Sequence, residues 1–510
     1  MRYSAPRYDP SEREFKSYYG VGSFSVLKTK PEATGMRFTR RTTLKRIAAT
    51  AICTPVLLLS RRAKAELPPL PNLPAIDALL LRPGDAQFDE YSLVFNARTM
   101  LAPQLRATCK NDHAVGDMVD WCRNNNLPFA LRSGGHCYEG FSESASVVID
   151  TRLMNEVNVD PGTMTAIAGA GASLGDVYKA IAPHGLAFPG GSCPTVGISG
   201  HVLGGGYGYL ARPFGLACDS VISINLVDPQ GRHIQADARH SPDLFWACRG
   251  GGGGSFGAAT SFQLKLHSIK DVFVFDIGWE SLTLNHASTI MKDWQAWAPQ
   301  APATITANLV IDRHLGGGIN LRCSGQTIGT LTELQRELAG LSSRPSIEKK
   351  SYMEAINHFS GDRAYKSILM KGKSDYASLP LNDAGLSILM NEINRRNVTY
   401  AICDPYGGAI ADITPDSTAF AHRRHSLFCL QYVSEWANSN EAPQRLSEMR
   451  DFYDTMRPYV SGAAYVNYCD LDLSNWPTAY WGMNLARLKQ IKSVFDPDNV
   501  FRHAQSVPLT

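Results

Sequence analysis

The segment Gly190-Gly-Ser-Cys-Pro-Thr-Val-Gly-Ile-Ser-Gly-His-Val-Leu-Gly-Gly-Gly-Tyr-Gly208 contains eight glycines among its nineteen residues, together with Cys193 and His201. Glycine lets the backbone adopt positive φ and approach a ligand without an intervening Cβ. Successive N–H groups in such a loop form a concave site that suits a pyrophosphate. Two further glycine clusters, Leu131–Gly140 and Arg249–Gly257, flank the segment in the sequence. Together the three clusters predict a cradle for a phosphate-bearing cofactor.

The three clusters resemble the vanillyl-alcohol-oxidase type of FAD-binding domain, and in particular the berberine-bridge-enzyme-like flavoproteins. The resemblance runs from Thr99 to the C-terminus. It implies that His136, in Arg132-Ser-Gly-Gly-His136, is bonded to the flavin 8α-methyl group, and that Cys193 is bonded to flavin C6. The alternative is three unrelated loops, with a buried cysteine and a hydrogen-bonded core histidine.

The resemblance also assigns most other residues of these loops to the FAD site. Cys137, beside the expected histidine tether, could compete with Cys193 for the ring. The predicted cofactor-binding set is His136, Cys193, Arg132, Ser133, Gly134, Gly135, Cys137, Gly191, Thr195, Val196, Gly197, Gly200, His201, Gly205, Gly206, Gly208, Gly257 and Asn467.

Tyr468 is the predicted catalytic base. The segment Tyr465-Val-Asn-Tyr468 resembles the family's C-terminal signature, in which the second tyrosine accepts a proton from the substrate. We expect a strand over 463–468, which would place Tyr465 and Tyr468 on opposite faces. A phenol with a pKa of about 10 needs nearby positive charge or hydrogen-bond donors to act as a base near neutral pH. The alternative is a buried tyrosine hydrogen-bonded to the fold.

Three more residues are candidates for the site. Asp404, in Ile402-Cys-Asp-Pro-Tyr-Gly-Gly408, resembles an aspartate that assists the tyrosine in carbohydrate oxidases of the family. A carboxylate raises the pKa of a neighbouring phenol, so we expect Asp404 to relay the proton or bind a substrate hydroxyl, unless it only forms an Asp-Pro turn. Tyr138 matches a tyrosine that lies over the site, or is a packing aromatic. Gln431 shares a strand face with Cys429 and is expected to bind substrate hydroxyls, or is an ordinary strand residue.

The chain order predicts an α+β fold, with a two-subdomain PCMH-type FAD-binding domain and an α/β substrate domain containing an antiparallel sheet. The expected divisions are a lead-in over 66–98 with a short helix ending near Arg82, the FAD-binding domain over 99–269, the substrate domain over 270–455, and a segment over 456–510 that returns to the FAD domain. Predicted helices include 286–297, 328–341, 382–395, 441–456 and 481–494, and predicted strands include 129–131, 146–150, 165–168, 221–228, 272–277, 305–311, 319–323 and 463–468.

Composition indicates a globular protein of two or three domains. The 510 residues are 44% hydrophobic and 19% charged, and the net charge of +3 is spread without long basic runs. Neither nucleic acid nor a membrane surface is therefore an expected partner. No cysteine pair has C-x-x-C spacing, and His422-Arg-Arg-His425 is interpreted as surface or packing rather than as a metal site.

The N-terminal 65 residues are typical of an export signal. A basic stretch, Thr39-Arg-Arg-Thr-Thr-Leu-Lys45, precedes the apolar stretch Ile47–Ser60 and the small-residue site Ala63-Lys-Ala65. The paired arginines resemble a twin-arginine signal, which predicts export to the periplasm or the exterior, cleavage after Ala65, and no membrane anchor after cleavage. Met36 is a candidate for the true start, and a disordered basic tail is the alternative reading.

The predicted function is that of a monomeric FAD oxidase whose partners are a small-molecule alcohol or sugar and O2. By resemblance to the carbohydrate oxidases, the substrate is a sugar whose anomeric hydroxyl is oxidised to a lactone, with H2O2 as the second product. One alternative is an oxidase or dehydrogenase acting on an alcohol of a secondary metabolite. A flavin-loaded binding protein is a third possibility, which the presence of Tyr468 and Asp404 disfavours.

Overall fold

The computed structural model describes residues 67–68, 76–341, 343–360 and 367–510. The chain divides into two units, Met1–Pro69 and Leu70–Thr510, and the second contains all the elements below. The predicted export segment, residues 1–65, lies outside the described residues. None of the helices in the described ranges is both long enough and apolar enough to cross a bilayer.

The first part of the FAD-binding region is a four-stranded sheet with the order β1-β2-β4-β3. The strands are β1 (Ala78–Leu81), β2 (Leu105–Cys109), β3 (Phe129–Arg132) and β4 (Val147–Asp150). Helix α2 (Asp112–Asn124) packs against this sheet and begins after Asn111, whose side chain accepts a hydrogen bond from the N–H of Ala114. The helix predicted to end near Arg82 is wrong, because the apolar run over 78–81 pairs antiparallel with β2.

The second part is a five-stranded antiparallel sheet with the order β5-β6-β10-β8-β9. Its strands are β5 (Val157–Asp160), β6 (Thr165–Gly169), β8 (Val221–Val227), β9 (His233–Asp237) and β10 (Ala258–Lys265). Helix α3 (Leu174–Ile181) begins after Ser173, which forms a capping box with Asp176. The glycine loops adjoin α4 (Ile198–Leu203) and α6 (Pro242–Ala247), and a small sheet pairs β7 (Leu186–Ala187) with β11 (His267–Ser268).

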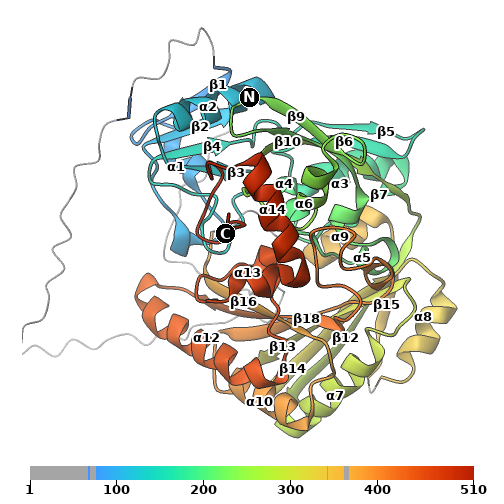
Figure 1. Cartoon of the computed structure of the whole chain (residues 1–510). Coiled ribbons are helices and arrows are strands. Elements are labelled where there is room, and N and C mark those ends of the chain that lie inside the picture. Colours follow the sequence, from blue (N-terminus) through green and yellow to red (C-terminus); the bar gives the residue numbers. More distant parts are fainter. Residues whose placement is uncertain (1–66, 69–75, 342, 361–366) are drawn as a thin grey trace, which may run out of the picture. The chain divides into compact units, whose positions relative to one another are not determined.

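The third sheet has seven antiparallel strands in the order β15-β12-β14-β13-β17-β18-β16. They are β12 (Val272–Leu282), β13 (Ile305–Arg313), β14 (Ile319–Thr327), β15 (Ser346–Lys350), β16 (Leu369–Ala377), β17 (Thr399–Pro405) and β18 (Phe428–Trp436). Helices α7 (Leu284–Trp297), α10 (Asp383–Asn394) and α12 (Ala442–Met456) lie on one side of this sheet, and the FAD-binding region lies on the other (Figure 1). The predicted α+β class with an antiparallel sheet is confirmed.

The two faces of the seven-stranded sheet differ in polarity. Directly opposed residues of antiparallel strands share a face. One set of opposed residues, Leu430, Cys403, Leu309 and Cys323, is fully buried on the side of the helices. The opposite face carries polar side chains on all the central strands, including Ser374, Gln431, Asp404, Asn308, Ser324 and Arg322. This polar face is turned toward the FAD-binding region.

The C-terminal segment closes the structure against the glycine loops. Helices α13 (Trp476–Trp481) and α14 (Leu485–Phe495) replace the single helix predicted over 481–494, because the chain turns at Gly482 with a φ of 47°. Nζ of Lys492 donates to the carbonyl of Ser255 and pairs with Asp496. The chain therefore returns to the FAD-binding region, as the sequence predicted.

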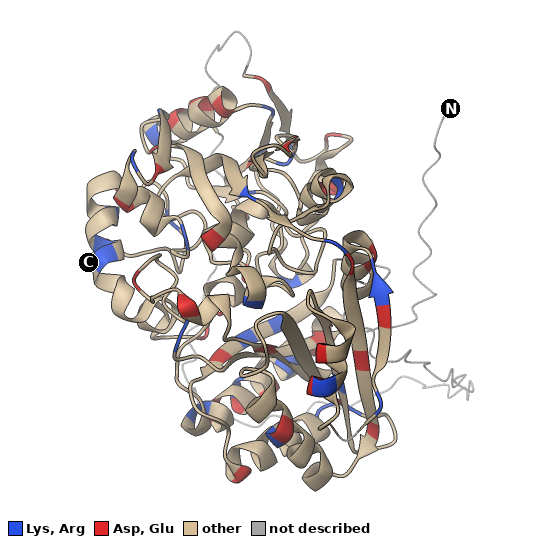
Figure 2. Ribbon diagram, turned by 90° about the vertical axis from the view of Figure 1, so that its right-hand side faces the viewer, with Lys and Arg blue, Asp and Glu red and all other residues tan. Residues whose placement is uncertain are grey.

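The shorter helices connect these layers. They are α1 (Phe88–Ser92), α5 (Ala211–Phe214), α8 (Leu331–Leu338), α9 (Tyr352–Ser360) and α11 (Ala409–Asp412). Acidic and basic residues are scattered over the ribbons of the described residues, and these ribbons show no stripe of one sign (Figure 2).

Candidate active site

The structure brings the three predicted catalytic residues together. The hydroxyl of Tyr468 lies 3.4 Å from Oδ2 of Asp404, near the end of β17. The rings of Tyr138 and Tyr468 are stacked, with centroids 5.6 Å apart and an interplanar angle of 7°. The loop after β3, the end of β17 and the C-terminal segment therefore converge on one point.

The prediction that Tyr465 and Tyr468 occupy opposite faces of a strand is wrong. Residues Val466–Tyr468 form a 3₁₀ turn, in which side chains three positions apart lie one above the other. The two rings accordingly pack edge to face, with centroids 4.8 Å apart. The hydroxyl of Tyr465 accepts a hydrogen bond from the N–H of Gly206, so this tyrosine fixes the glycine segment beside Tyr468, the predicted catalytic base.

Asp404 is held in a buried polar chain. Nδ2 of Asn308 donates to its Oδ1 at 2.7 Å, and the hydroxyl of Tyr207 donates to Oδ1 of Asn308 at 3.1 Å. Burial raises the pKa of Asp404 to about 7, and the hydrogen bond from Tyr468 opposes this rise. The carboxyl group can therefore change protonation state near neutral pH, as a proton relay requires.

Sequence reasoning missed Asn308 and Tyr207. Asn308 is a polar residue within the predicted apolar strand over 305–311, and this break in the pattern was the available signal. Its partner Asp404 is 96 positions away, so their contact depends on the pairing of β13 with β17.

Gln431 and Cys429 share a face of β18, as predicted, and this is the polar face of the sheet. Asp404 is opposite Cys429, and Ile402 is opposite Gln431 in the ladder of β17 and β18. Nε2 of Gln431 donates to the hydroxyl of Tyr138 at 2.8 Å. Oε1 of Gln431 is buried and has no hydrogen-bond partner among the described residues. This oxygen is an acceptor available to a ligand hydroxyl.

The two predicted tethers meet at Thr195. Nε2 of His136 lies 2.9 Å from the hydroxyl oxygen of Thr195, and Sγ of Cys193 lies 3.5 Å from the same oxygen. The imidazole of His136 stacks on Phe95 with centroids 4.5 Å apart. Burial, assisted by the charge of Arg132, lowers the pKa of His136 to about 3. The imidazole is therefore neutral, which is the state in which a ring nitrogen can form a bond to carbon.

The glycine loops form a backbone cradle that fits a flat cofactor. A Cβ on Gly134 would lie 2.2 Å from the N atom of Gly197. The backbones of the clusters Leu131–Gly140 and Gly190–Gly208 are therefore in contact. A Cβ on Gly200 would meet no atom within 4 Å, and one on Gly253 would come only within 3.8 Å of Gly200. The backbone of the clusters Gly190–Gly208 and Arg249–Gly257 therefore borders open space at Gly200 and Gly253.

Several predicted cofactor residues have contacts that support these loops. The N–H of Gly191 donates to Nε2 of His201, and Nδ2 of Asn467 donates to the carbonyl of His201. Ser133 Oγ donates to the carbonyl of Ala170. Gly135, Gly205 and Gly206 have positive φ values of 70°, 118° and 85°. A Cβ on Gly208 would lie within 3 Å of the carbonyl oxygen of Gly190, and a Cβ on Gly257 within 3 Å of the carbonyl oxygen of Val227.

The side chain of Arg132, a residue of the predicted cofactor-binding set, lies in an ionic cluster. Its guanidinium is buried and pairs with Glu143 at 2.5 Å and with Asp150 at 3.7 Å. Arg106 also pairs with both of these carboxylates. This ionic cluster holds the side chain of Arg132 and braces the loop that carries His136.

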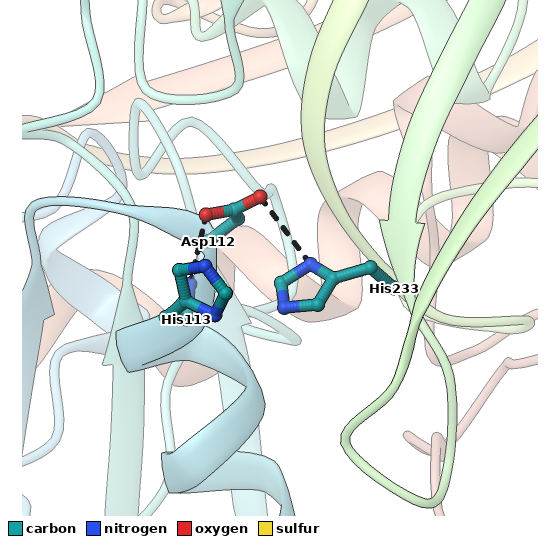
Figure 3. Close-up of side chains that lie close together, drawn as sticks. All are labelled: Asp112, His113 and His233. Carbon is teal, nitrogen blue, oxygen red and sulfur yellow. Dashed lines mark hydrogen bonds and ion pairs between the residues drawn. The ribbon is translucent and has the colours of Figure 1, made fainter.

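One group of side chains in the described part of the chain has ligand atoms close enough to hold a metal ion. It consists of Asp112, His113 and His233, whose ligand atoms lie within 4.8 Å of one another (Figure 3). Asp112 pairs with Nδ1 of His233 at 3.3 Å across the seam between α2 and β9. None of the predicted site residues belongs to this group.

In the His422–His425 segment, Arg423 is buried and pairs with Asp219, in keeping with a packing role.

Comparison with known proteins places the chain in a family. The FAD binding domain model matches residues 103–237, and the berberine and berberine-like model matches residues 464–508. An uncharacterised FAD-linked oxidoreductase of Bacillus subtilis, YgaK, is 31% identical over 439 residues, covering 83% of this chain and 95% of that protein. The chain belongs to the berberine-bridge-enzyme-like FAD-linked oxidoreductases.

Solved structures agree with this assignment. BBE-like 1 of Physcomitrella patens superposes with a TM-score of 0.80 at 31% identity, covering 85% of this oxidoreductase and 97% of the moss chain. Phl p 4, described as a grass pollen allergen with glucose dehydrogenase activity, superposes with a TM-score of 0.78 at 30% identity over 85% of this chain and 97% of its own. A doubly substituted variant of that allergen, with a TM-score of 0.78 at 31% identity and the same coverage, is described as a glucose oxidase.

Proposed function

We propose that this oxidoreductase oxidises the anomeric hydroxyl of a sugar to a lactone and passes the electrons to O2, giving H2O2. The bound FAD supplies the hydride acceptor. The observation that carries the sugar assignment is the polar face of the seven-stranded sheet beside Tyr468. The glucose activities described for Phl p 4 and its variant support the same substrate class.

The polar face offers several hydrogen-bonding groups to a polyhydroxylated ligand. Oε1 of Gln431 is a buried acceptor whose isolation costs free energy until a donor reaches it. Arg322 and Ser324 lie on β14, on the same face as Asn308 and half-buried. A sugar carries hydroxyls on successive ring carbons, so it can satisfy acceptors and donors spread across neighbouring strands.

Proton removal is assigned to Tyr468 and Asp404. Tyr468 accepts the proton of the substrate hydroxyl, and ionised Asp404 accepts the proton that Tyr468 gives up across the 3.4 Å contact. Asn308 occupies Oδ1 of Asp404, which leaves Oδ2 for Tyr468. Relay to the carboxylate avoids a free phenolate beside a negative charge, which charge repulsion would disfavour.

His136 and Cys193 are proposed to hold FAD by two covalent bonds. Their common neighbour Thr195 supports this, because 8α-methyl and C6 belong to the same ring of the flavin and the two linking atoms must lie close together. Two bonds keep the ring in one plane against the loops and prevent loss of the cofactor. Retention would suit the export that the sequence of residues 1–65 indicates, and N-terminal sequencing of the native protein would test that export.

The function is tested with a panel of aldoses, oligosaccharides and aromatic alcohols, with oxygen uptake, peroxide release and dye reduction measured in parallel. We expect one H2O2 per sugar oxidised. Dye reduction without oxygen uptake would identify a dehydrogenase, and turnover of aromatic alcohols alone would identify an oxidase of secondary metabolites. Either result would overturn the proposal, as would an inactive but flavin-loaded protein.

A further inference from the structure

Two cysteines lie where the catalytic segments meet. Cys137 follows the predicted tether His136, and Cys469 follows the predicted base Tyr468. Their sulfur atoms are 3.6 Å apart, although 332 positions separate them in the sequence. Both are free thiols in the structure.

The packing around the thiols fixes their separation. On one side, the Tyr138 ring stacks on Tyr468. On the other, Nζ of Lys371 binds Glu139 at 2.5 Å and Asp470 at 2.6 Å. The two segments are thus joined at adjacent positions by a ring stack and by a shared buried cation. A disulfide needs a sulfur separation of about 2.05 Å, so the sulfurs must approach by less than the length of one C–S bond.

The two thiols differ in reactivity. The hydrogen bond between the two sulfur atoms, together with the N–H groups of Glu139 and Phe141, lowers the pKa of Cys137. The same contact raises the pKa of Cys469 well above its ordinary value. Cys137 is also half-buried, whereas Cys469 is buried. Because the thiolate is the nucleophile, Cys137 is the thiol that attacks an oxidant and Cys469 is the thiol that follows.

We propose that Cys137 and Cys469 are a peroxide-reactive pair that closes to a disulfide. The sulfur of Cys137 attacks one oxygen of hydrogen peroxide, the O–O bond breaks, and a sulfenic acid and one water form. The sulfur of Cys469 then attacks the sulfenic sulfur, the S–O bond breaks, and the released hydroxide leaves with the thiol proton as a second water. The two thiols lose two electrons, and one peroxide becomes two waters.

The bond would tie the segment carrying His136 to the segment carrying Tyr468. It would also stop oxidation of Cys137 at a reversible stage, before the irreversible sulfinic acid forms. That the protein's own turnover supplies the peroxide rests on the proposed oxidase function. The pair itself can be tested with added peroxide, so its failure and the failure of the oxidase assignment are distinguishable.

The experiment treats the flavin-loaded, full-length protein with dithiothreitol, removes the reductant, adds a tenfold excess of hydrogen peroxide, and alkylates the remaining thiols. Peptide mass spectrometry without reduction should find the peptides of Cys137 and Cys469 joined, two hydrogens lighter than their sum, and separated again by dithiothreitol. The closed loop should also make the oxidised protein migrate faster on a non-reducing gel. Two alkylated, unlinked cysteines after peroxide treatment would overturn the proposal.

Variants make the assignment specific. Cys469→Ser should abolish the linked peptide and leave Cys137 as the sulfinic acid, whereas Cys137→Ser should leave Cys469 reduced and alkylated. The matched control Cys248→Ala removes a buried cysteine at the end of α6 and should keep the cross-link. A Cys137 that remains a thiol in Cys469→Ser would contradict the proposed order of attack. The linked peptide of the unsubstituted protein provides a test that does not depend on any variant folding.

Discussion

Replacing Asp404 with asparagine should stabilise the fold and abolish most turnover. The substitution keeps an oxygen that can accept the hydrogen bond from Asn308, but it removes a charge from a position where the side chain is 4% exposed. Burial raises the pKa of Asp404 from 3.8 to about 7. In the pH window between these values the native state holds a proton that the unfolded chain has lost, so stability falls as pH rises through the window.

The size of the effect follows from the shift. Each pKa unit corresponds to 1.36 kcal/mol, so a rise of roughly three units predicts that the unsubstituted protein loses about 4 kcal/mol between pH 4 and pH 8. The stabilising contribution of the proton is fully present below pH 4 and is gone above pH 7. Asp404→Asn escapes this loss, because its amide does not titrate. The two proteins should therefore differ most at pH 8 and least at pH 4.5.

The assay is urea unfolding followed by tryptophan fluorescence at pH 4.5, 6 and 8, with the flavin content of each sample matched. Asp454→Asn, at an exposed position on α12, is the control and should follow the unsubstituted protein. Turnover of Asp404→Asn should fall by 10²- to 10⁴-fold, the usual value of a group that handles a proton. The reasoning would be refuted if Asp404→Asn were no more stable than the unsubstituted protein at pH 8. It would also be refuted if the difference in free energy of unfolding between the two proteins were the same at every pH.

Four further predictions follow from the same contacts. Tyr468→Phe should keep the yellow cofactor and lose 10²- to 10⁴-fold in turnover, as measured by peroxide release, whereas unchanged activity would remove Tyr468 from the mechanism. Asn308→Leu should displace the acidic limb of the pH profile of turnover, because it removes the donor that fixes Asp404, and an unshifted profile would contradict that role. Lys371→Met should lower the free energy of unfolding by about 1.5–3 kcal/mol, because Glu139 and Asp470 would lose the cation that they share and keep only Arg98 and Lys373 as separate partners, and a neutral effect in urea unfolding would count against it. His136→Ala combined with Cys193→Ala should release all flavin on acid precipitation, whereas the parent should retain it in the pellet.

Much of the fold could be predicted because its signals are local. The helices predicted over 286–297 and 382–395, and the strands that became β12 to β14, each depend on residues a few positions apart. The motifs around His136 and Cys193 likewise identified the FAD-binding loops. The helices and strands follow from propensity and periodicity, whereas the FAD-binding loops were identified by their resemblance to the family.

The errors arose where distant contacts decide the local structure. Residues 78–81 form a strand because β2 lies alongside them, although their own pattern suited a helix. The segment before Tyr468 turns instead of extending, because Tyr465 binds Gly206. Asn308 joins the site only through the ladder of β13 and β17.

The placement of the cofactor is tested most directly by peptide mapping of the purified protein. After proteolysis under acidic conditions, the account predicts that one flavin joins two peptides, one containing His136 and the other Cys193. Flavin released free, or bound to one peptide only, would contradict the doubly tethered cofactor from which the roles of Tyr468, Asp404 and Gln431 are derived.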